Sequence, residues 1–114
     1  MPSDQDRVIV HPRVLSIIAA LTALSVPGVA RLRPTSSPLL RLWQRRNGVP
    51  GVSLRTHGDS VMIDLHLVAN AGFGLLSVSR RVQAAVARAV AEMTDMQVRQ
   101  VDVYVDGVRA GTYS

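Results

Sequence analysis

Apolar residues recur at helical spacing in two parts of the chain. Between residues 12 and 25 they follow steps of three and four, which places them on one face of a helix. These residues are Val14, Leu15, Ile17, Ile18, Leu21 and Leu24. A similar stripe extends from Leu75 to Met93. The spacing predicts two amphipathic helices, each with one apolar face directed to the core.

Other segments combine β-branched residues with alternating apolar and polar positions, which predicts strands. They are 7–10, 29–33, 52–56, 61–68 and 98–106. The third and fourth of these segments flank Gly58-Asp59, which indicates a hairpin with a two-residue turn. In that hairpin we expect Arg55 to pair with Met62. Asp106-Gly107 is expected to form a turn after the last strand.

The predicted elements follow one another as strand, helix, strand, two hairpin strands, helix and strand. Helices and strands that each bury one face are typical of a two-layer arrangement. We therefore predict an α/β chain, more narrowly an α+β two-layer sandwich, with a mixed sheet of about five strands and both helices on one face. Residues 1–6 are expected to be a disordered tail. Residues 7–114 are expected to be a single domain with an irregular Arg-rich loop at 34–50.

Composition narrows the classes of function. The chain has 114 residues, of which 47% are hydrophobic and only 4% aromatic, so we expect an aliphatic core. The absence of cysteine excludes disulfides and thiolate metal sites. No apolar run approaches the roughly 20 residues that span a bilayer. All 13 basic residues are arginine and the net charge is +5, which favours a surface that meets phosphates or carboxylates.

Side chains suited to catalysis or metal binding are scattered along the predicted polar face of the sheet. His57 and His66 lie at opposite ends of the hairpin, too far apart to bind one ion. Asp102 and Asp106 alternate with core valines, as exposed strand residues do. General acid–base catalysis needs a cleft, and nothing in this pattern predicts one. We therefore expect no enzyme activity, no catalytic residue, no metal and no cofactor.

Two candidate contact surfaces lie outside the second helix. The first is an apolar and basic stretch in the loop, which either packs on the domain's own core or contacts a partner or an anionic membrane surface. Its residues are Leu39, Leu42, Trp43, Arg45 and Arg46. The second is the polar face of the sheet, whose mixed charges and tyrosine suit a contact with another protein. Its residues are Arg55, Asp64, Gln100, Asp102 and Tyr104.

A third candidate surface is a basic ridge on the second helix. It consists of Arg80, Arg81 and Arg88. Such a ridge either is a solvated helix face or binds phosphates. The chain lacks the loop and the aromatic pairs with which common RNA-binding modules hold bases, so nucleic acid is the less favoured partner.

Four blocks of sequence, in order, resemble the bacterial alkaline shock protein family, also called envelope stress response proteins. The blocks are Val8-Ile9-Val10 with a helix ending in Val26-Pro27-Gly28-Val29; Gly51-Val52 followed by Val61-Met62-Ile63-Asp64-Leu65; Phe73-Gly74 opening a helix that ends in Met93-Thr94; and Val101-Asp102-Val103-Tyr104-Val105-Asp106-Gly107-Val108. Two features depart from the family pattern. Asp95 stands where the family usually has glycine, and the segment 34–50 does not align.

The resemblance implies a cytoplasmic protein that lies beneath the cell membrane and is linked to envelope stress. Members of the family self-associate or are tethered by a small membrane-anchored protein, and no catalytic residues are established for them. We therefore predict a non-enzymatic scaffold or adaptor, peripheral to the inner face of the membrane. Two alternatives remain, namely a nucleic-acid-binding domain that uses the Arg-rich helix and loop, and a regulatory protein tied to fatty-acid precursor metabolism.

Overall fold

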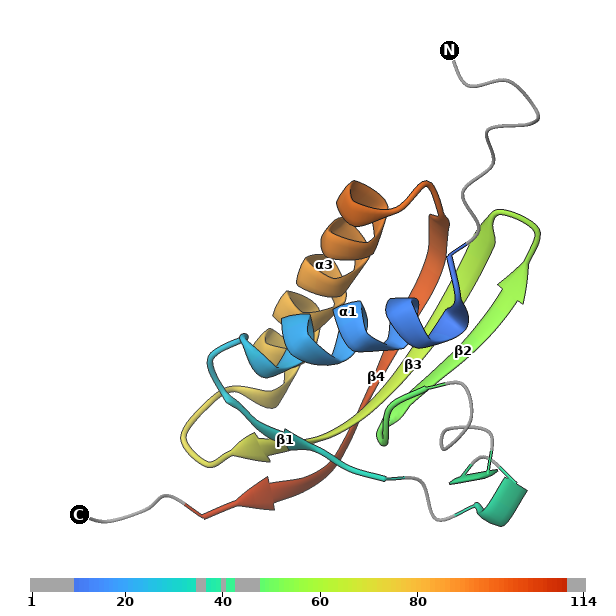
Figure 1. Ribbon diagram of the computed structural model, residues 1–114. Helices are drawn as coiled ribbons and strands as arrows, with labels where there is room; N and C mark the ends of the chain where they lie inside the picture. The colour runs from blue at the N-terminus through green and yellow to red at the C-terminus, as the bar shows by residue number, and fades with distance from the viewer. Residues whose placement is uncertain (1–9, 35–36, 40, 43–47, 111–114) are drawn as a thin grey trace.

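The computed structural model describes residues 10–34, 37–39, 41–42 and 48–110 of the chain. In chain order its elements are helix α1 (Pro12–Leu24), strands β1 (Val29–Leu32), β2 (Val52–His57) and β3 (Ser60–Asn70), helix α3 (Leu75–Met93) and strand β4 (Gln97–Arg109) (Figure 1). Both helices lie on the same side of the sheet. The predicted α+β two-layer sandwich is therefore confirmed.

Strand β3 is the centre of a mixed sheet, because each of the other described strands pairs with it. Strand β4 runs parallel to β3 along its whole length and so occupies one edge. Strands β2 and β1 are antiparallel to β3 and share its other edge, β2 beside residues 60–65 and β1 beside residues 67–69. This register decides which side chains of distant segments become neighbours.

The described residues form four strands, where the sequence pattern predicts about five. The additional strand was expected at 7–10. Val10 has irregular backbone, and residues 7–9, like the tail expected at 1–6, lie outside the described residues. The turn predicted at Asp106-Gly107 is wrong, because β4 continues through it to Arg109. Asp106 is the extra residue of a bulge in β4, so the strand accommodates it without ending.

Helix α1 starts at a proline and is followed by a glycine that allows close packing. Pro12 occupies the first turn, where a missing N–H breaks no helical hydrogen bond, and the Nδ1 atom of His11 accepts a hydrogen bond from the backbone N–H of Arg13 at 3.0 Å. After the helix, Gly28 adopts a φ of +101°. A Cβ atom on Gly28 would lie 2.6 Å from Cγ2 of Val78. The glycine therefore lets the end of α1 approach the start of α3.

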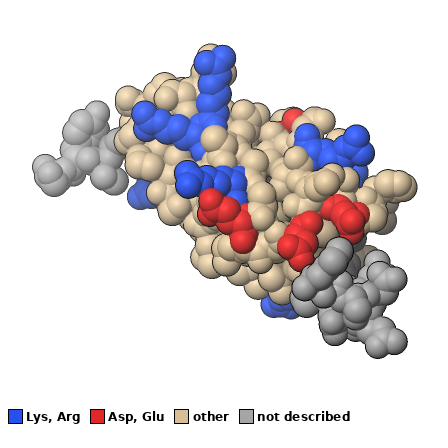
Figure 2. Space-filling view, turned by 90° about the horizontal axis from the view of Figure 1, so that it is seen from above, with Lys and Arg blue, Asp and Glu red and all other residues tan. Residues whose placement is uncertain are grey.

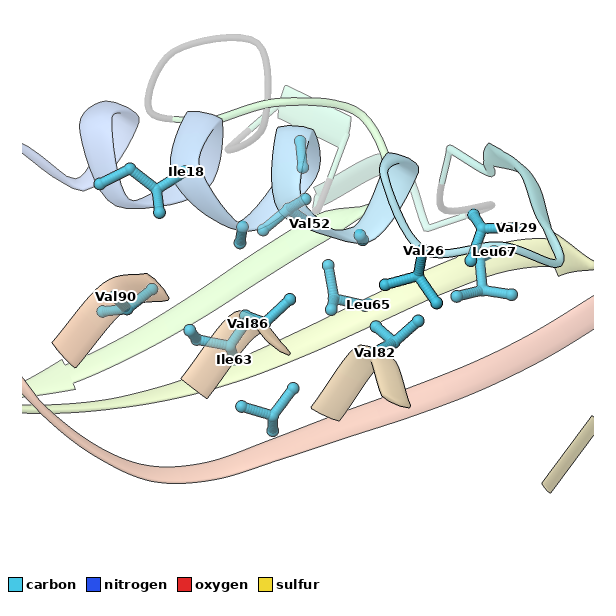
Figure 3. Packing of buried hydrophobic residues seen from close by; sticks show 14 of the residues in the cluster. Ile18, Val26, Val29, Val52, Ile63, Leu65, Leu67, Val82, Val86 and Val90 are labelled. Carbon is cyan, nitrogen blue, oxygen red and sulfur yellow. The ribbon is translucent and has the colours of Figure 1, made fainter. Parts of the chain in front are cut away.

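The core lies between the helices and the sheet and is aliphatic (Figure 3). Helix α3 contributes one fully buried valine every four residues, and strand β3 contributes its alternate residues. The valines are Val78, Val82, Val86 and Val90, and the strand residues are Val61, Ile63, Leu65, Leu67 and Ala69. The buried side chains recur every four residues in the helix and every two residues in the strand, and together they form one continuous apolar layer.

The buried face of α1 differs from the face that the sequence spacing predicts. Leu15 and Ile18 are buried as expected, but they are joined by small residues, namely Ser16, Ala19, Ala20 and Ala23. The other members of the predicted face are exposed, namely Val14, Ile17, Leu21 and Leu24. The helix is apolar around most of its circumference, so spacing alone does not select one face. Small alanines allow closer packing on the sheet, so the face that contains them is the buried one.

Candidate interaction surface

The face of the sheet that points away from the helices carries alternate residues of β2, β3 and β4. In β3, Val61, Ile63 and Leu65 are fully buried towards the helices, whereas Met62 and Asp64 between them are only partly buried. Strand pairing arranges the outward residues in three rows, which we call the open sheet face. The rows are Ser53–Asp64–Asp102, Arg55–Met62–Gln100 and His66–Tyr104. The structure thus brings all five residues predicted for the sheet face onto one surface.

Two carboxyl groups are neighbours at the centre of the open sheet face. Asp64 and Asp102 are paired in the parallel register of β3 and β4. Burial raises the pKa of Asp64 above its usual value, and the charge and hydrogen bonding of Asp102 raise it further, while the charges of Arg55 and His66 oppose the shift. The Asp102 carboxylate also accepts a hydrogen bond from Nε2 of Gln100 at 2.7 Å. The centre of this surface therefore combines two neighbouring carboxyl groups with the guanidinium of Arg55.

We expect the substitution Asp64→Asn to stabilise the protein near pH 7 and to have no such effect near pH 3. A raised folded-state pKa means that the folded protein binds the proton more tightly than the unfolded chain. Asp64 therefore favours folding below its unfolded pKa, and this contribution is lost as the pH rises through the folded pKa. Because solvent screens a partly exposed pair, the gain should stay below about 1 kcal/mol.

Urea unfolding of the Asp64→Asn variant and the wild type at both pH values measures this gain. Asp95→Asn makes the same chemical change at an exposed position after α3 and is the matched control. Equal or lower stability of Asp64→Asn near neutral pH would contradict the expectation.

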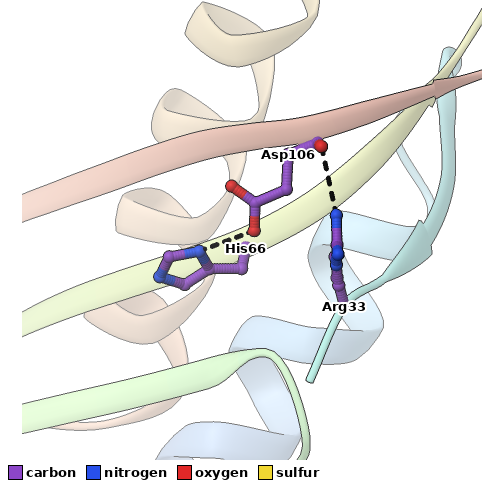
Figure 4. A network of polar contacts seen from close by, with 3 residues as sticks. All are labelled: Arg33, His66 and Asp106. Carbon is purple, nitrogen blue, oxygen red and sulfur yellow. Dashed lines mark hydrogen bonds and ion pairs between the residues drawn. The ribbon is translucent and has the colours of Figure 1, made fainter. Parts of the chain in front are cut away.

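At one end of the open sheet face, residues of β3, β4 and the segment after β1 form a polar cluster (Figure 4). The Nδ1 atom of His66 lies 2.9 Å from Oδ2 of Asp106. The Arg33 guanidinium donates a hydrogen bond to the backbone carbonyl of Asp106 at 3.2 Å. The ring of His66 stacks on the ring of Tyr104, with centroids 4.6 Å apart and an interplanar angle of 12°. These contacts hold an aromatic pair in a fixed position at the surface.

The sequence pattern identifies Tyr104 but misses Arg33 and the contact between His66 and Asp106. Asp106 belongs to an expected turn in the sequence, whereas the β4 bulge places its carboxylate beside His66. His57, the other histidine of the hairpin, pairs with Ser60 at the opposite end of β3. Within the described ranges, no group of three or more His, Cys, Asp or Glu residues is arranged to hold a metal ion.

A groove of about 380 Å³ lies on the surface between α3 and β4. Its lining residues are Arg80, Gln83, Ala84, Ala87, Val98, Arg99, Gln100 and Val101. Nε2 of Gln83 donates a hydrogen bond to the carbonyl of Val101 at 3.1 Å, which ties the helix to the strand. The groove is thus lined by two arginines, Arg80 from α3 and Arg99 from β4.

The predicted basic ridge does not behave as one unit. Arg80 lines the groove, whereas the Nε of Arg88 lies 2.9 Å from Oε1 of Glu92, one helical turn away. This contact raises the pKa of Arg88 and offsets its charge. Arg81 is exposed beside them. In Figure 2 the arginine side chains project at several separate places with carboxylates between them. Such an interspersed surface lacks the continuous positive stripe typical of nucleic-acid binding.

The 39–46 segment is described in part. Arg41 donates its backbone N–H to the carbonyl of Ser37 at 2.9 Å, which closes a short helical turn. Leu39 and Leu42 are both exposed on that turn. Trp43, Arg45 and Arg46 lie outside the described residues. The described leucines therefore remain available for contacts with another molecule.

These features define a compact α+β fold with one polar face of its sheet left uncovered by the described helices. The family model of the alkaline shock proteins, described as having a cell envelope-related function, matches residues 1–110. The chain belongs to this family, and the resemblance that its sequence blocks indicate is thereby confirmed. No helix among the described residues is both long and apolar enough to cross a bilayer.

The chain is also similar to uncharacterized proteins and, in its fold, to a solved domain. The uncharacterized protein YqhY of Bacillus subtilis is 24% identical over 107 residues, which cover 93% of this chain and 79% of that protein. Spy1535 of Streptococcus pyogenes is 28% identical over 104 residues, which cover 90% of this chain and 79% of that protein. A variant of the MamM C-terminal domain has a TM-score of 0.54 and 14% identity, covering 89% of this chain and 82% of its own. Identity this low shows a common fold alone.

Proposed function

We propose that this protein is a non-enzymatic scaffold or adaptor at the cytoplasmic face of the cell envelope, linked to envelope stress. It docks onto a membrane-anchored partner protein through the open sheet face, and it self-associates. The cell envelope-related function of the alkaline shock protein family supports the location. The observation that carries the docking role is the open sheet face, which the described helices leave uncovered and which presents a preformed aromatic and charged surface.

The composition of that surface matches a protein–protein contact. Tyr104 is about half exposed although its ring is stacked on His66. Tyrosine and arginine are enriched in interfaces, and Arg55 and Arg33 lie on either side of this pair along the sheet. Because the stack and the hydrogen bonds of Asp106 already hold these side chains, binding would lose less conformational entropy there. A partner with complementary charges therefore meets a largely preorganised surface.

The placement of the acidic and imidazole groups supports a non-enzymatic role. General acid–base catalysis relies on a site that excludes water around the reacting groups. The groove between α3 and β4 is lined by neither Asp64 nor His66, and both of these residues lie on the open sheet face. A surface of this kind binds another molecule more readily than it performs chemistry.

We expect Tyr104→Ser combined with Arg55→Glu to release the protein from membranes of the cells that produce it. The two changes remove the exposed ring and reverse one charge of the open sheet face, so docking through it should be lost. Sedimentation of membranes followed by immunoblotting measures the bound fraction, and circular dichroism checks folding. Met93→Ser, at an exposed position at the end of α3, is the control and should stay bound. Unchanged sedimentation of the folded double variant would reject docking by this face.

The 39–46 segment supplies a second contact in this proposal. Leu39 and Leu42 are exposed, and the sequence of this segment also contains arginines. An apolar and basic stretch of this kind suits an anionic membrane surface. The same sedimentation assay on Leu42→Ser with Trp43→Ser tests that contact. Full retention of this variant would assign membrane association to the open sheet face alone.

One observation favours nucleic acid as a second candidate partner. Arg80 and Arg99 line the same groove, and arginine side chains suit a phosphate backbone. The pairing of Arg88 with Glu92 weakens this candidate. Retardation of RNA at low salt that disappears steeply with added salt, and that Arg80→Ala with Arg99→Ala abolishes, would favour it over the adaptor role.

A further inference from the structure

Helix α1 presents a second apolar stripe that its own domain does not use. Val14, Ile17, Leu21 and Leu24 are 46%, 40%, 64% and 45% exposed, respectively, although all four are large and aliphatic. The steps between them are three, four and three residues. This is the spacing of the two core positions of a heptad, which forms a narrow seam suited to a second helix.

The stripe is distinct from the face that holds α1 on the sheet. The buried residues of the helix are Leu15, Ser16, Ile18, Ala19, Ala20 and Ala23, and none of the four stripe residues is among them. The outward stripe therefore lies outside the core. Contact of its apolar side chains with water is unfavourable in free energy. Large aliphatic side chains in a continuous row on a helix surface mark a surface that another molecule covers.

We propose that a second copy of this chain covers the stripe, with the two α1 helices packed antiparallel about a two-fold axis. Val14 then lies opposite Leu24 of the second copy, and Ile17 lies opposite Leu21 of the second copy. This inference rests on the proposed function, since it supplies the surface for the self-association included there. A two-fold contact needs a self-complementary patch. The steps between the stripe residues are three, four and three from either end of the helix, so the stripe is complementary to a reversed copy of itself.

Charge complementarity selects the antiparallel direction. Arg13 is the one charged residue within α1, and the helix has no basic residue in its last turn. The pairing of Val14 with Leu24 places Arg13 of each copy beside Ser25, the C-terminal cap, of the other copy. The carbonyl end of a helix carries partial negative charge, which the guanidinium would offset. Parallel pairing would instead bring the two Arg13 side chains together.

The low number of charged residues in α1 also argues against a lipid surface as the molecule that covers the stripe. A helix that lies in a membrane interface typically carries several Lys or Arg residues beside its apolar face. Apart from Arg13, the residues of α1 are uncharged. A helix of this composition matches the apolar seam of another copy better than it matches anionic headgroups.

Other exposed apolar residues lie outside the stripe. The ring of Phe73 lies next to Gly28, shortly after α1 ends, and is 44% exposed. Leu76, at the start of α3, is also exposed. The interface still relies on few residues, so we expect a dimer whose population rises with concentration rather than a permanent one.

Sedimentation velocity over a range of protein concentrations tests the dimer. We expect the wild type to shift from monomer to dimer, and Leu21→Glu to remain monomeric with at least about a hundredfold weaker association, because a carboxylate would be buried opposite Ile17 of the second copy. Met93→Glu changes an equally exposed apolar residue at the far end of α3 and should dimerise like the wild type. A monomeric wild type up to millimolar concentration, or a Leu21→Glu variant that still dimerises, would overturn the proposal.

Cysteine cross-linking tests the direction of packing. The natural chain has no cysteine, so introduced thiols report on single positions. An equimolar mixture of Val14→Cys and Leu24→Cys proteins should oxidise to a mixed disulfide dimer. Each variant alone should not, because its two thiols would be separated by about 15 Å along the helices. Cross-linking of each variant with itself, without the mixed product, would overturn the antiparallel arrangement.

The membrane assay separates this proposal from the adaptor role. If Leu21→Glu is monomeric yet sediments with membranes, α1 pairing holds and docking is independent of it. If Tyr104→Ser with Arg55→Glu leaves the membrane but still dimerises, the open sheet face docks and α1 pairs separately. If Leu21→Glu dimerises while the sheet-face variant is released, α1 pairing is wrong and the adaptor role stands.

Discussion

Replacing Leu65 by alanine should lower the free energy of unfolding by about 3 to 4 kcal/mol. Leu65 is fully buried in the central strand, and the register places it between Val52 of β2 and Val103 of β4. The substitution leaves a cavity that neither neighbouring strand can close without disturbing its hydrogen bonds to β3. A domain of this size is stable by about 5 to 15 kcal/mol, so the variant should lose a large part of its stability.

Urea unfolding followed by circular dichroism measures this loss as a lower midpoint at an unchanged slope. Leu76→Ala makes the same chemical change at an exposed position in the first turn of α3 and should shift the free energy of unfolding by less than about 0.5 kcal/mol. If the two variants were equally stable, the assignment of Leu65 to the core would be wrong.

Replacing Gly28 by alanine should lower the free energy of unfolding by about 2 to 4 kcal/mol. Two effects combine at this position. The φ of +101° is one that side-chain-bearing residues rarely adopt, and the new Cβ would lie 2.6 Å from Cγ2 of the buried Val78. Relief of that overlap requires the end of α1 to move away from α3, which opens the core between them.

Gly72→Ala is the matched control, because Gly72 has a similar φ of +93° but a Cβ there would meet nothing within 4 Å. It should show the backbone effect alone, about 1 kcal/mol. The difference between the two variants then isolates the close approach of the helices. Equal destabilisation by both would show that the contact between Gly28 and Val78 contributes nothing to stability.

The sequence pattern predicts local structure well where one short-range signal dominates. The Gly58-Asp59 turn fixes the hairpin register, and the predicted pairing of Arg55 with Met62 is confirmed. The alternation in β4 likewise places Asp102 and Tyr104 on the outward face. The bulge at Asp106 is less predictable, because Asp-Gly is also the common signal for a turn. Only the continued pairing of β4 with β3 distinguishes the two.

By itself the sequence determined both helices, the hairpin, the aliphatic core and the membership of the family, since spacing, turn residues and ordered motifs are local properties of the chain. The tertiary structure alone decided which face of α1 is buried. Both faces of that helix are apolar, and the choice depends on how closely Ala19 and Ala23 approach the rest of the core. It also decided that His66 meets Tyr104 and Asp106. Asp106 lies 40 positions beyond His66 in the chain, and only the parallel register of β3 and β4 brings these residues together.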